Sequence, residues 1–216
     1  MSDIFNEVDE EVRREQLKKL WERYGNLIIG LAFLVVAAVA GWRGYEYWQA
    51  RKAAEAGASY EAALKLSDDG KHSEAEEALA KLAAGGTSGY RVLARMREAA
   101  ELGLTDPKAG VAAYDAIAGE PGQPLVRDLA AVRAALLLVD TAKLDEMTQR
   151  LEALTQPTSP FRHTARELLA LSAWRNGDAA AARKWAEAAT GDPEAPPGVR
   201  TRAEVLTTLL ADASKP

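Results

Sequence analysis

An uncharged apolar stretch near the start of the chain most restricts how it can fold. The stretch reads GNLIIGLAFLVVAAVAGW from Gly25 to Trp42, eighteen residues without Asp, Glu, Lys or Arg. Crossing about 30 Å of hydrocarbon takes roughly 17–25 residues of helix. The stretch therefore predicts a single transmembrane helix, which we place at residues 26–44.

Aromatic side chains stand on both sides of the stretch, with charged residues immediately outside it. Indole and phenol rings prefer the interface between hydrocarbon and water, so this pattern is typical of a membrane span. The alternative, a buried core helix of a soluble protein, rarely has aromatic residues at both ends. The predicted membrane anchor and interface belt consists of Trp21, Tyr24, Trp42, Arg43, Tyr45, Tyr47 and Trp48.

A cleavable signal peptide is a second interpretation of the same stretch. Ala38-Val39-Ala40 before Gly41 fits the pattern of small residues at a cleavage site. Against it, the 26 residues before Leu27 include seven acids, whereas a signal peptide begins with a short basic segment. The sequence favours a retained anchor and leaves open a soluble binding module released after Ala40.

The basic residues around the span predict its orientation. Five precede it (Arg13, Arg14, Lys18, Lys19, Arg23) and three follow it (Arg43, Arg51, Lys52). Since Lys and Arg are enriched on the cytoplasmic side, we expect residues 1–25 in the cytoplasm and residues 45–216 in the periplasm. Residues 3–24 have apolar positions three or four apart, which predicts an amphipathic helical arm, either simply solvated or a docking surface for another protein.

An internal repeat follows Arg51. Four similar segments begin at Gly70, Thr105, Ala142 and Gly177, at intervals of 35, 37 and 35 residues. Each has apolar or small residues five, nine and twelve positions after its start, which lie on one face of a helix. These residues are Ala75, Leu79 and Leu82; Gly110, Tyr114 and Ile117; Met147, Leu151 and Leu154; and Ala182, Ala186 and Ala189.

A second helical pattern precedes each of these segments, at 53–66, 90–102, 125–139 and 161–174. Two helices in a period near 34 residues are typical of tetratricopeptide repeats, whose hairpins bury their apolar faces against one another. Asp106-Pro107 and Gly177-Asp178 are suitable helix starts, and residues 198–212 predict a final capping helix with a polar outer side. The predicted fold is therefore all-α: one transmembrane helix, then a tetratricopeptide-like solenoid of about four hairpins and a cap.

Composition argues against several functions. The chain has a net charge of −5 and no basic patch interleaved with aromatics, so we expect no nucleic-acid partner. It has no cysteine, and its two histidines, His72 and His163, lack evident partners for a triad or a metal, so we predict surface or capping roles for them. A solvated helix face explains the acidic pairs Glu76-Glu77 and Glu98/Glu101. We therefore predict no catalytic residue, no metal site, no cofactor and no enzymatic activity.

The anchor and its flank resemble one known family. Gly41, Trp42, Arg43 and the aromatic residues up to Trp48 carry the resemblance, together with Ser59-Tyr60, Leu169–Asp178 and the long N-terminal arm. With four degenerate repeats behind the anchor, the chain resembles the ancillary SecYEG translocon subunits of the bacterial inner membrane, in their alphaproteobacterial form. The resemblance implies a single-pass inner-membrane protein that helps pass secreted chains to periplasmic chaperones. It implies as partners the SecYEG translocon, a membrane-anchored periplasmic peptidyl-prolyl isomerase and unfolded secreted clients, besides the lipid bilayer. It implies no catalytic residue.

Binding is the function that the repeats themselves favour. The first helices of such hairpins line a concave surface that accepts a peptide or a partner helix. First-helix residues that could line it are Tyr60, Tyr90, Arg91, Arg95, Arg127, Arg133, Arg162 and Trp174. An architectural role, as a cell-envelope scaffold for a division or cell-wall synthesis complex, is the alternative.

Overall fold

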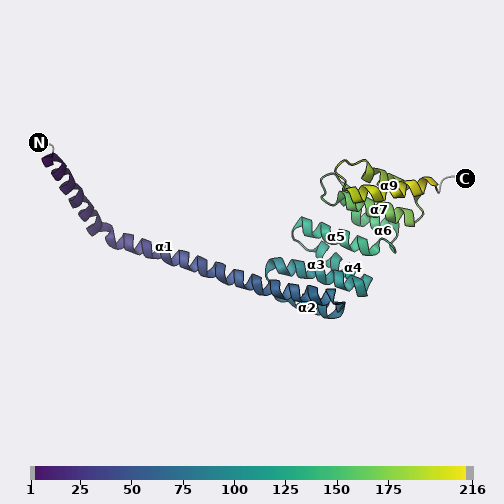
Figure 1. Ribbon diagram of the computed structural model, residues 1–216, viewed down its shortest axis with the longest axis horizontal. Helices are drawn as coiled ribbons and strands as arrows, with labels where there is room; N and C mark the ends of the chain where they lie inside the picture. Colours follow the sequence, from purple (N-terminus) through teal and green to yellow (C-terminus); the bar gives the residue numbers. More distant parts are fainter. Residues whose placement is uncertain (1–2, 213–216) are drawn as a thin grey trace. The chain divides into compact units, whose positions relative to one another are not determined.

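The computed structural model describes residues 3–212, and the side chains of residues 14, 15 and 17–211. This part of the chain is all-α: it holds nine α-helices and one 3₁₀ helix and no strand (Figure 1). The elements are α1 (Asp3–Asp68), α2 (His72–Gly85), α3 (Ser88–Thr105), α4 (Pro107–Gly119), α5 (Pro124–Leu138), α6 (Leu144–Leu151), η1 (Glu152–Thr155), α7 (Arg162–Arg175), α8 (Ala179–Thr190) and α9 (Pro197–Asp212). The chain divides into two units, one ending at Ala54 and the other beginning at Glu55.

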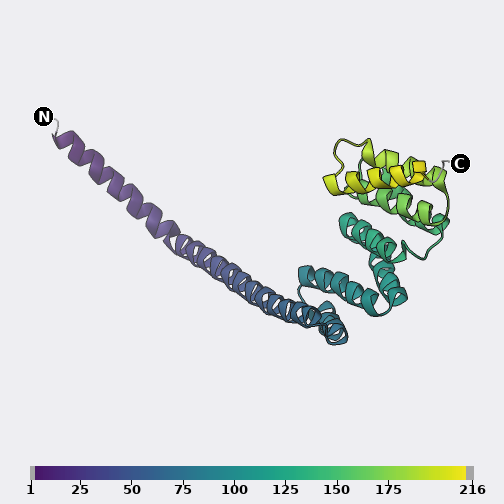
Figure 2. The ribbon, with the colours of Figure 1, turned by 45° about the vertical axis from the view of Figure 1, so that its right-hand side comes forward.

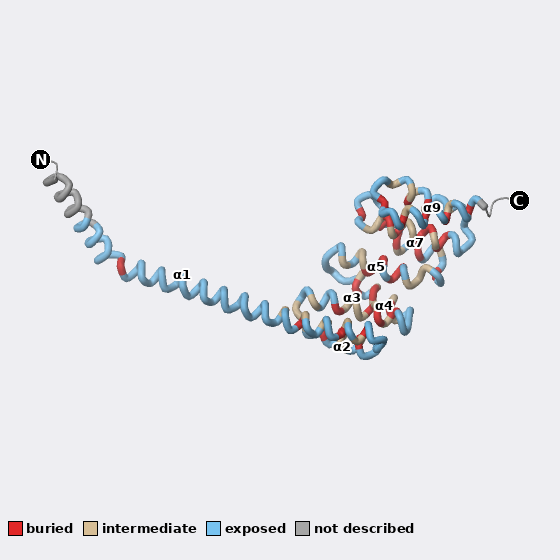
Figure 3. Tube along the Cα trace, viewed as in Figure 1, coloured by how far each residue is buried: buried red, intermediate tan, exposed pale blue. Residues whose placement is uncertain are grey.

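The first unit exposes its apolar side chains on every side of α1. Large apolar residues from Leu27 to Val39 are all exposed, Phe33 by 75%, and no other part of the unit covers them (Figure 3). Successive helical residues are about 100° apart, so seven such residues between Ile28 and Val36 point in all directions. A helix that is apolar all round and uncovered by protein does not fit a core helix of a soluble domain. It is compatible with a single-pass membrane anchor, and α1 is long and apolar enough to cross a bilayer.

The predicted N-terminal arm is helical from Asp3 onward as part of α1. The side chains of Ile4, Val8 and Val12, on which its predicted apolar face partly depends, lie outside the described ones. Further along, Glu15 and Lys19 form an ion pair of 3.7 Å, one turn apart, on the solvated surface. Leu17, Leu20, Trp21 and Tyr24 are exposed.

The second unit consists of the four predicted hairpins. They pair the last part of α1 with α2, α3 with α4, α5 with α6, and α7 with α8, and α9 packs on α8 and α7 (Figure 2). Each apolar cluster combines one hairpin with the helix that follows it; the cluster around Leu79, for instance, takes Ala56 and Ala63 from α1 and Ala94 from α3. A hairpin alone would leave that face exposed, so stacking is what buries it.

The phase of the sequence repeat is confirmed by burial. All twelve predicted core positions of the second helices are buried. The first core position of the second helix is small in three hairpins, where Ala75, Gly110 and Ala182 are buried. At Gly110 the helices α3 and α4 approach closely, since a Cβ there would lie 2.5 Å from Gly103 Cα. In the third hairpin Met147 takes this place, and α6 is only a short helix before the chain tightens into η1.

The turns inside the hairpins follow from local chemistry. Asp106 caps α4 by accepting from the backbone N–H groups of Lys108 and Ala109 at 3.0 and 3.2 Å, and Pro107 opens that helix. Asp178 caps α8 by accepting from Ala181 N at 2.9 Å. The preceding Gly177 has φ of +79°, a conformation that side chains with a Cβ rarely adopt.

Two features differ from the prediction. The transmembrane stretch and the first repeat helix belong to one uninterrupted helix, α1, because nothing between Trp48 and Ala53 breaks a helix. The capping helix α9 buries Val199, Ala203, Leu206 and Leu210, but its outer side is not wholly polar as predicted, since Val205 and Leu209 are exposed.

Ala182 tests the packing of the fourth hairpin. Its side chain is fully buried between α8 and its neighbours, so we expect Ala182→Trp to overpack the core and lower the free energy of unfolding by about 1–3 kcal/mol. Urea unfolding of the detergent-solubilised chain, followed by circular dichroism, measures the loss. Ala180→Trp is the matched control, because Ala180 is exposed on the same helix. Equal stabilities of the two variants would contradict the assigned core face.

Candidate functional site

The predicted interface belt carries polar contacts of its own. Trp42 Nε1 donates to Glu46 Oε1 at 2.9 Å, and Arg43 Nη1 donates to Glu46 Oε2 at 3.2 Å. The Lys52 ammonium lies 4.0 Å from the centre of the Trp48 ring. Because the indole N–H and the arginine both reach Glu46, the one acid of this segment is paired. The arrangement suits the interface of a bilayer, where rings need an apolar environment and a polar contact at once.

The two tyrosines of the predicted binding face pack inside the repeat unit. Tyr60 and Tyr90 have ring centres 6.1 Å apart and lie against the apolar cluster of α1, α2 and α3. A Cβ added to Gly57 would come within 2.7 Å of the Tyr90 hydroxyl, so the glycine makes room for this ring. Both rings are partly buried, and they join neighbouring hairpins.

Three of the predicted arginines bind groups of their own chain. Arg95 makes a bidentate pair with Glu120, at 2.6 and 2.7 Å, and the charged partner raises the pKa of Arg95 through these hydrogen bonds. Arg127 Nε donates to the carbonyl oxygen of Ala118 at 3.0 Å. Arg162 belongs to a network around Asp192. The remaining residues, Arg91, Arg133 and Trp174, are exposed, Trp174 by 48%.

A pocket of about 240 Å³ brings Arg95 and Arg127 together. It lies between α3 and α5, beside the end of α4. Its apolar walls are Val92, Ile117 and Val126, and its polar ones are Arg95, Arg127, Glu120 and the loop 121–123. The Arg95–Glu120 pair bridges α3 and the loop that follows α4 and thus holds one wall in place. Only Arg95 and Arg127 among the pocket residues belong to the binding face that the sequence predicts. The signal that could have revealed the pocket is an aliphatic residue beside an arginine on each helix: Val92 on α3 and Val126 on α5.

Glu101 forms a second polar site, and the prediction of a solvated position for it was wrong. Its side chain is 1% exposed in α3. Ser67 Oγ donates to Oε1 at 2.7 Å, Arg97 Nε lies 2.8 Å from Oε1, and His72 Nδ1 lies 2.8 Å from Oε2. Burial alone would raise the pKa of Glu101, but the hydrogen bonds from Ser67 and His72 and the charge of Arg97 hold it below its usual value. The site joins α1, α2 and α3, and gives His72 a structural role.

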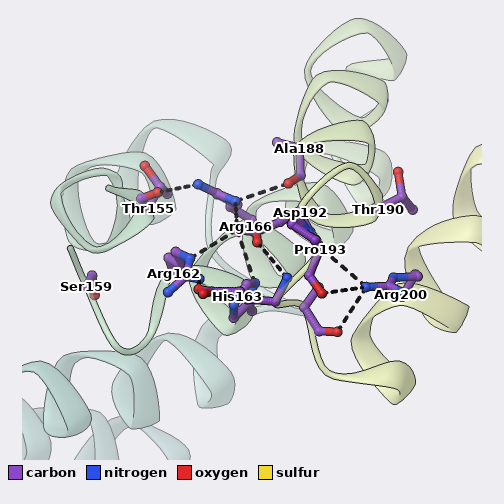
Figure 4. A network of polar contacts seen from close by, with 12 residues as sticks. Thr155, Ser159, Arg162, His163, Arg166, Ala188, Thr190, Asp192, Pro193 and Arg200 are labelled. Carbon is purple, nitrogen blue, oxygen red and sulfur yellow. Dashed lines mark hydrogen bonds and ion pairs between the residues drawn. The ribbon is translucent and has the colours of Figure 1, made fainter. Parts of the chain in front are cut away.

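A third polar site ties the loop between α8 and α9 to α7 (Figure 4). Asp192 Oδ2 accepts from Arg162 Nε and Arg166 Nη1, each at 3.0 Å. Arg166 also donates to the carbonyl oxygens of Ala188 and Thr155, at 3.1 and 3.0 Å, and Arg162 to Glu194. Arg200 binds the backbone of the same loop on its other side, through the carbonyl of Pro193 at 3.2 Å. These contacts of Asp192 join α7 to the loop before α9 and so support the packing of the last helices.

His163 lies at the edge of this network and is buried, contrary to the predicted surface or capping role. Its Nδ1 is 3.7 Å from Asp192 Oδ2 and makes no hydrogen bond. Burial lowers the pKa of His163, and the charge of Arg162 lowers it further. The ring thus lies inside the fold among the charged side chains of this network.

The Asp192 network predicts a defined pH dependence. The hydrogen bond from Arg162 and that from the backbone N–H of Glu194 lower the Asp192 pKa from 3.8 to about 2. Since the folded-state pKa is the lower one, the stabilisation from Asp192 is complete above pH 3.8 and is lost as the pH falls towards 2. We expect Asp192→Asn to be less stable than the unmodified chain at neutral pH, with the gap in melting temperature closing below pH 4. A gap that does not change with pH would show that the carboxylate charge contributes nothing.

Metal-dependent or triad-type chemistry gains no positive support from these sites. Among the described residues, no group of three or more His, Asp or Glu side chains could hold a metal ion. The buried ionisable groups Glu101, Asp192 and His163 are paired or enclosed within the fold. The geometry offers the pocket beside Arg95 and Arg127 and a set of structural ion pairs, which suits a protein that binds other proteins.

The fold and the pocket define a class, a helical-hairpin repeat protein of the tetratricopeptide type. Comparison with known protein families agrees: residues 18–203 match the tetratricopeptide repeat-like domain. The chain therefore belongs to the tetratricopeptide repeat-like domain family. Comparison with curated proteins and with solved structures gives no significant match. Domains of this kind are typically non-catalytic scaffolds that bind other proteins. Membership of the family therefore supports a role in protein–protein interaction.

Proposed function

We propose that this protein is a membrane-anchored accessory of the Sec protein-export translocon that binds protein partners through its repeats. One observation carries the proposal: a single family domain, residues 18–203, includes both the exposed apolar helix and the stacked hairpins. A cleaved signal peptide is removed from the mature protein and is not expected within its folded domain. The extent of the family domain therefore favours a retained anchor. The choice of the translocon as the partner is based on the resemblance of the anchor and its flank to ancillary SecYEG subunits.

The proposal assigns each segment a place and a task. Residues 1–25 form a cytoplasmic arm, residues 26–44 span the inner membrane, and residues 45–216 act in the periplasm. The excess of Lys and Arg before the span supports this orientation. The partners proposed on the resemblance are SecYEG, a membrane-anchored peptidyl-prolyl isomerase and unfolded secreted chains, which the repeats help pass to chaperones.

Partner identification from native membranes tests the proposal. The tagged full-length chain is purified in mild detergent after crosslinking in the cell, and its partners are identified by mass spectrometry. Recovery of translocon subunits supports the proposal. Recovery of division or cell-wall synthesis proteins in their place favours the envelope scaffold. A main product that begins at Gly41 favours the cleaved binding module.

An anchor exchange separates the two tasks. Residues 1–48 are replaced by an unrelated single span of the same orientation, and protease added to spheroplasts confirms that residues beyond about 50 remain outside. If the native anchor recruits the protein, crosslinking to the channel weakens while binding of the repeats to their periplasmic partner persists. Intact crosslinking in the exchanged protein would place recruitment in the repeats.

A further inference from the structure

The pocket between α3 and α5 has the size of a side-chain site. Its volume of about 240 Å³ is below the roughly 300–1,000 Å³ of small-molecule and cofactor pockets. Val92 and Val126 line it from the two helices, and Ile117, almost fully buried, adds apolar surface from α4. A pocket of this volume with aliphatic walls suits one aliphatic side chain of an extended segment.

The charged residues that line the pocket give it a net positive charge. Two arginines, Arg95 and Arg127, stand against one acid, Glu120, whereas the chain as a whole carries a net charge of −5. Arg95 uses both terminal nitrogens on Glu120, so its charge is matched within the wall. Arg127 binds only through Nε, to the Ala118 carbonyl, and within the described part of the chain its Nη atoms donate no hydrogen bond. Arg127 is thus the cation that remains for a ligand.

We propose that this pocket binds a segment of a partner protein that carries an aliphatic side chain flanked by carboxylates. The aliphatic group enters between Val92 and Val126, and a neighbouring carboxylate accepts hydrogen bonds from the Nη atoms of Arg127. Arg91 stands one helical turn before Arg95 on α3 and is exposed, which adds positive charge on the same side of that helix. The inference rests on the proposed function in one respect, that the repeats bind a protein partner. It adds which side chains the bound segment of that partner carries.

A designed peptide tests the pocket directly. The probe is a fluorescein-labelled twelve-residue peptide of Gly and Ser with one Leu between two Glu at its centre. Its binding to the full-length chain in an uncharged detergent is measured by fluorescence anisotropy. We expect peptides with Gln in place of both Glu, or with Ser in place of Leu, to bind about fivefold more weakly. Higher salt should weaken binding of the Glu peptide and leave that of the Gln peptide unchanged.

Variants of the protein locate the binding. Arg127→Gln should weaken the Glu peptide by about two- to fivefold without changing binding of the Gln peptide. Val92→Asp, which places an acid on the aliphatic wall, should weaken it further. Arg183→Gln is the matched control, because Arg183 is exposed on α8 and lines neither the pocket nor the predicted binding face, and it should bind as the unmodified chain does. Circular dichroism of each variant confirms that the helices are intact.

The outcomes separate this inference from the proposed function. Absence of peptide binding, equal binding of the Glu and Gln peptides, or equal losses in Arg127→Gln and Arg183→Gln would each overturn the pocket assignment, even where translocon subunits are recovered. Selective loss in Arg127→Gln and Val92→Asp would support it, even where no translocon subunit is found.

Discussion

Replacing Gly110 by alanine is expected to lower the free energy of unfolding of the repeat unit by about 3 kcal/mol or more. At this position α4 touches the backbone of α3. A Cβ built on Gly110 would lie 2.5 Å from Gly103 Cα and 2.7 Å from Gly103 N, with Ala99 O at 3.1 Å. All three are backbone atoms of a helix, which cannot rotate away as a side chain can. The methyl group therefore forces α3 and α4 apart and opens the cluster around Tyr114 and Ile117.

Gly119→Ala in the same helix is the control for this experiment. A Cβ there would meet no atom within 4 Å, and its backbone does not have a positive φ. Alanine is the better helix former, so this variant should equal or exceed the unmodified chain, by up to about 1 kcal/mol. Urea unfolding of both detergent-solubilised variants gives the comparison. If Gly110→Ala unfolds at the same urea concentration as the unmodified chain, the result would contradict the assigned backbone contact between α3 and α4.

The repeat could be predicted from sequence because the signal is periodic and local. Small residues such as Ala75 and Ala182 recur near the start of three of the four second helices, each followed by two apolar or small residues on the same face. Stacked hairpins repeat one packing environment, so the sequence repeats the residue types which fit it. The signal of the long apolar helix is equally local, since length and hydropathy alone predict a helix that could cross a bilayer. Where the repeat drifts, as at Met147, the structure also departs from the pattern and shortens the helix.

The polar sites could not be predicted in the same way, because their partners are distant in the sequence. Glu101 looks like any acid on an exposed helix face until α1 brings Ser67, 34 residues earlier, against it. The Arg95–Glu120 pair that shapes the pocket joins residues 25 apart. The sequence predicts Arg162 as a candidate for the binding face because it lies on a first helix, and it gives no sign of the bond to Asp192 in a loop 30 residues later. Such pairs depend on which loop reaches which helix, and a period of apolar residues does not encode that.

Replacing Glu101 by alanine is the second change expected to have a large effect, a loss of about 3–5 kcal/mol in the free energy of unfolding. The carboxylate is buried at the meeting point of three helices and accepts from Ser67, with Arg97 and His72 as charged or ionisable neighbours. Removing it takes away the ion-pair partner of Arg97 and the acceptor of the Ser67 hydroxyl, and creates a cavity beside α2. The first hairpin would lose the contacts that Ser67 and His72 make with Glu101 of α3.

Glu98, one turn earlier on the same helix, is the matched control for Glu101. Burial, together with the nearby charge of Glu76, raises the pKa of Glu98, so its ionised form is disfavoured where that of Glu101 is favoured. Glu98→Ala should therefore be neutral or slightly stabilising at pH 7. Glu101→Gln separates charge from shape: since the Glu101 pKa is lowered from 4.5, its stabilisation is full above that pH and is lost on acidification, and the glutamine variant should lack this loss. Equal unfolding of Glu98→Ala and Glu101→Ala at pH 7 would show that the buried carboxylate does not join α1, α2 and α3.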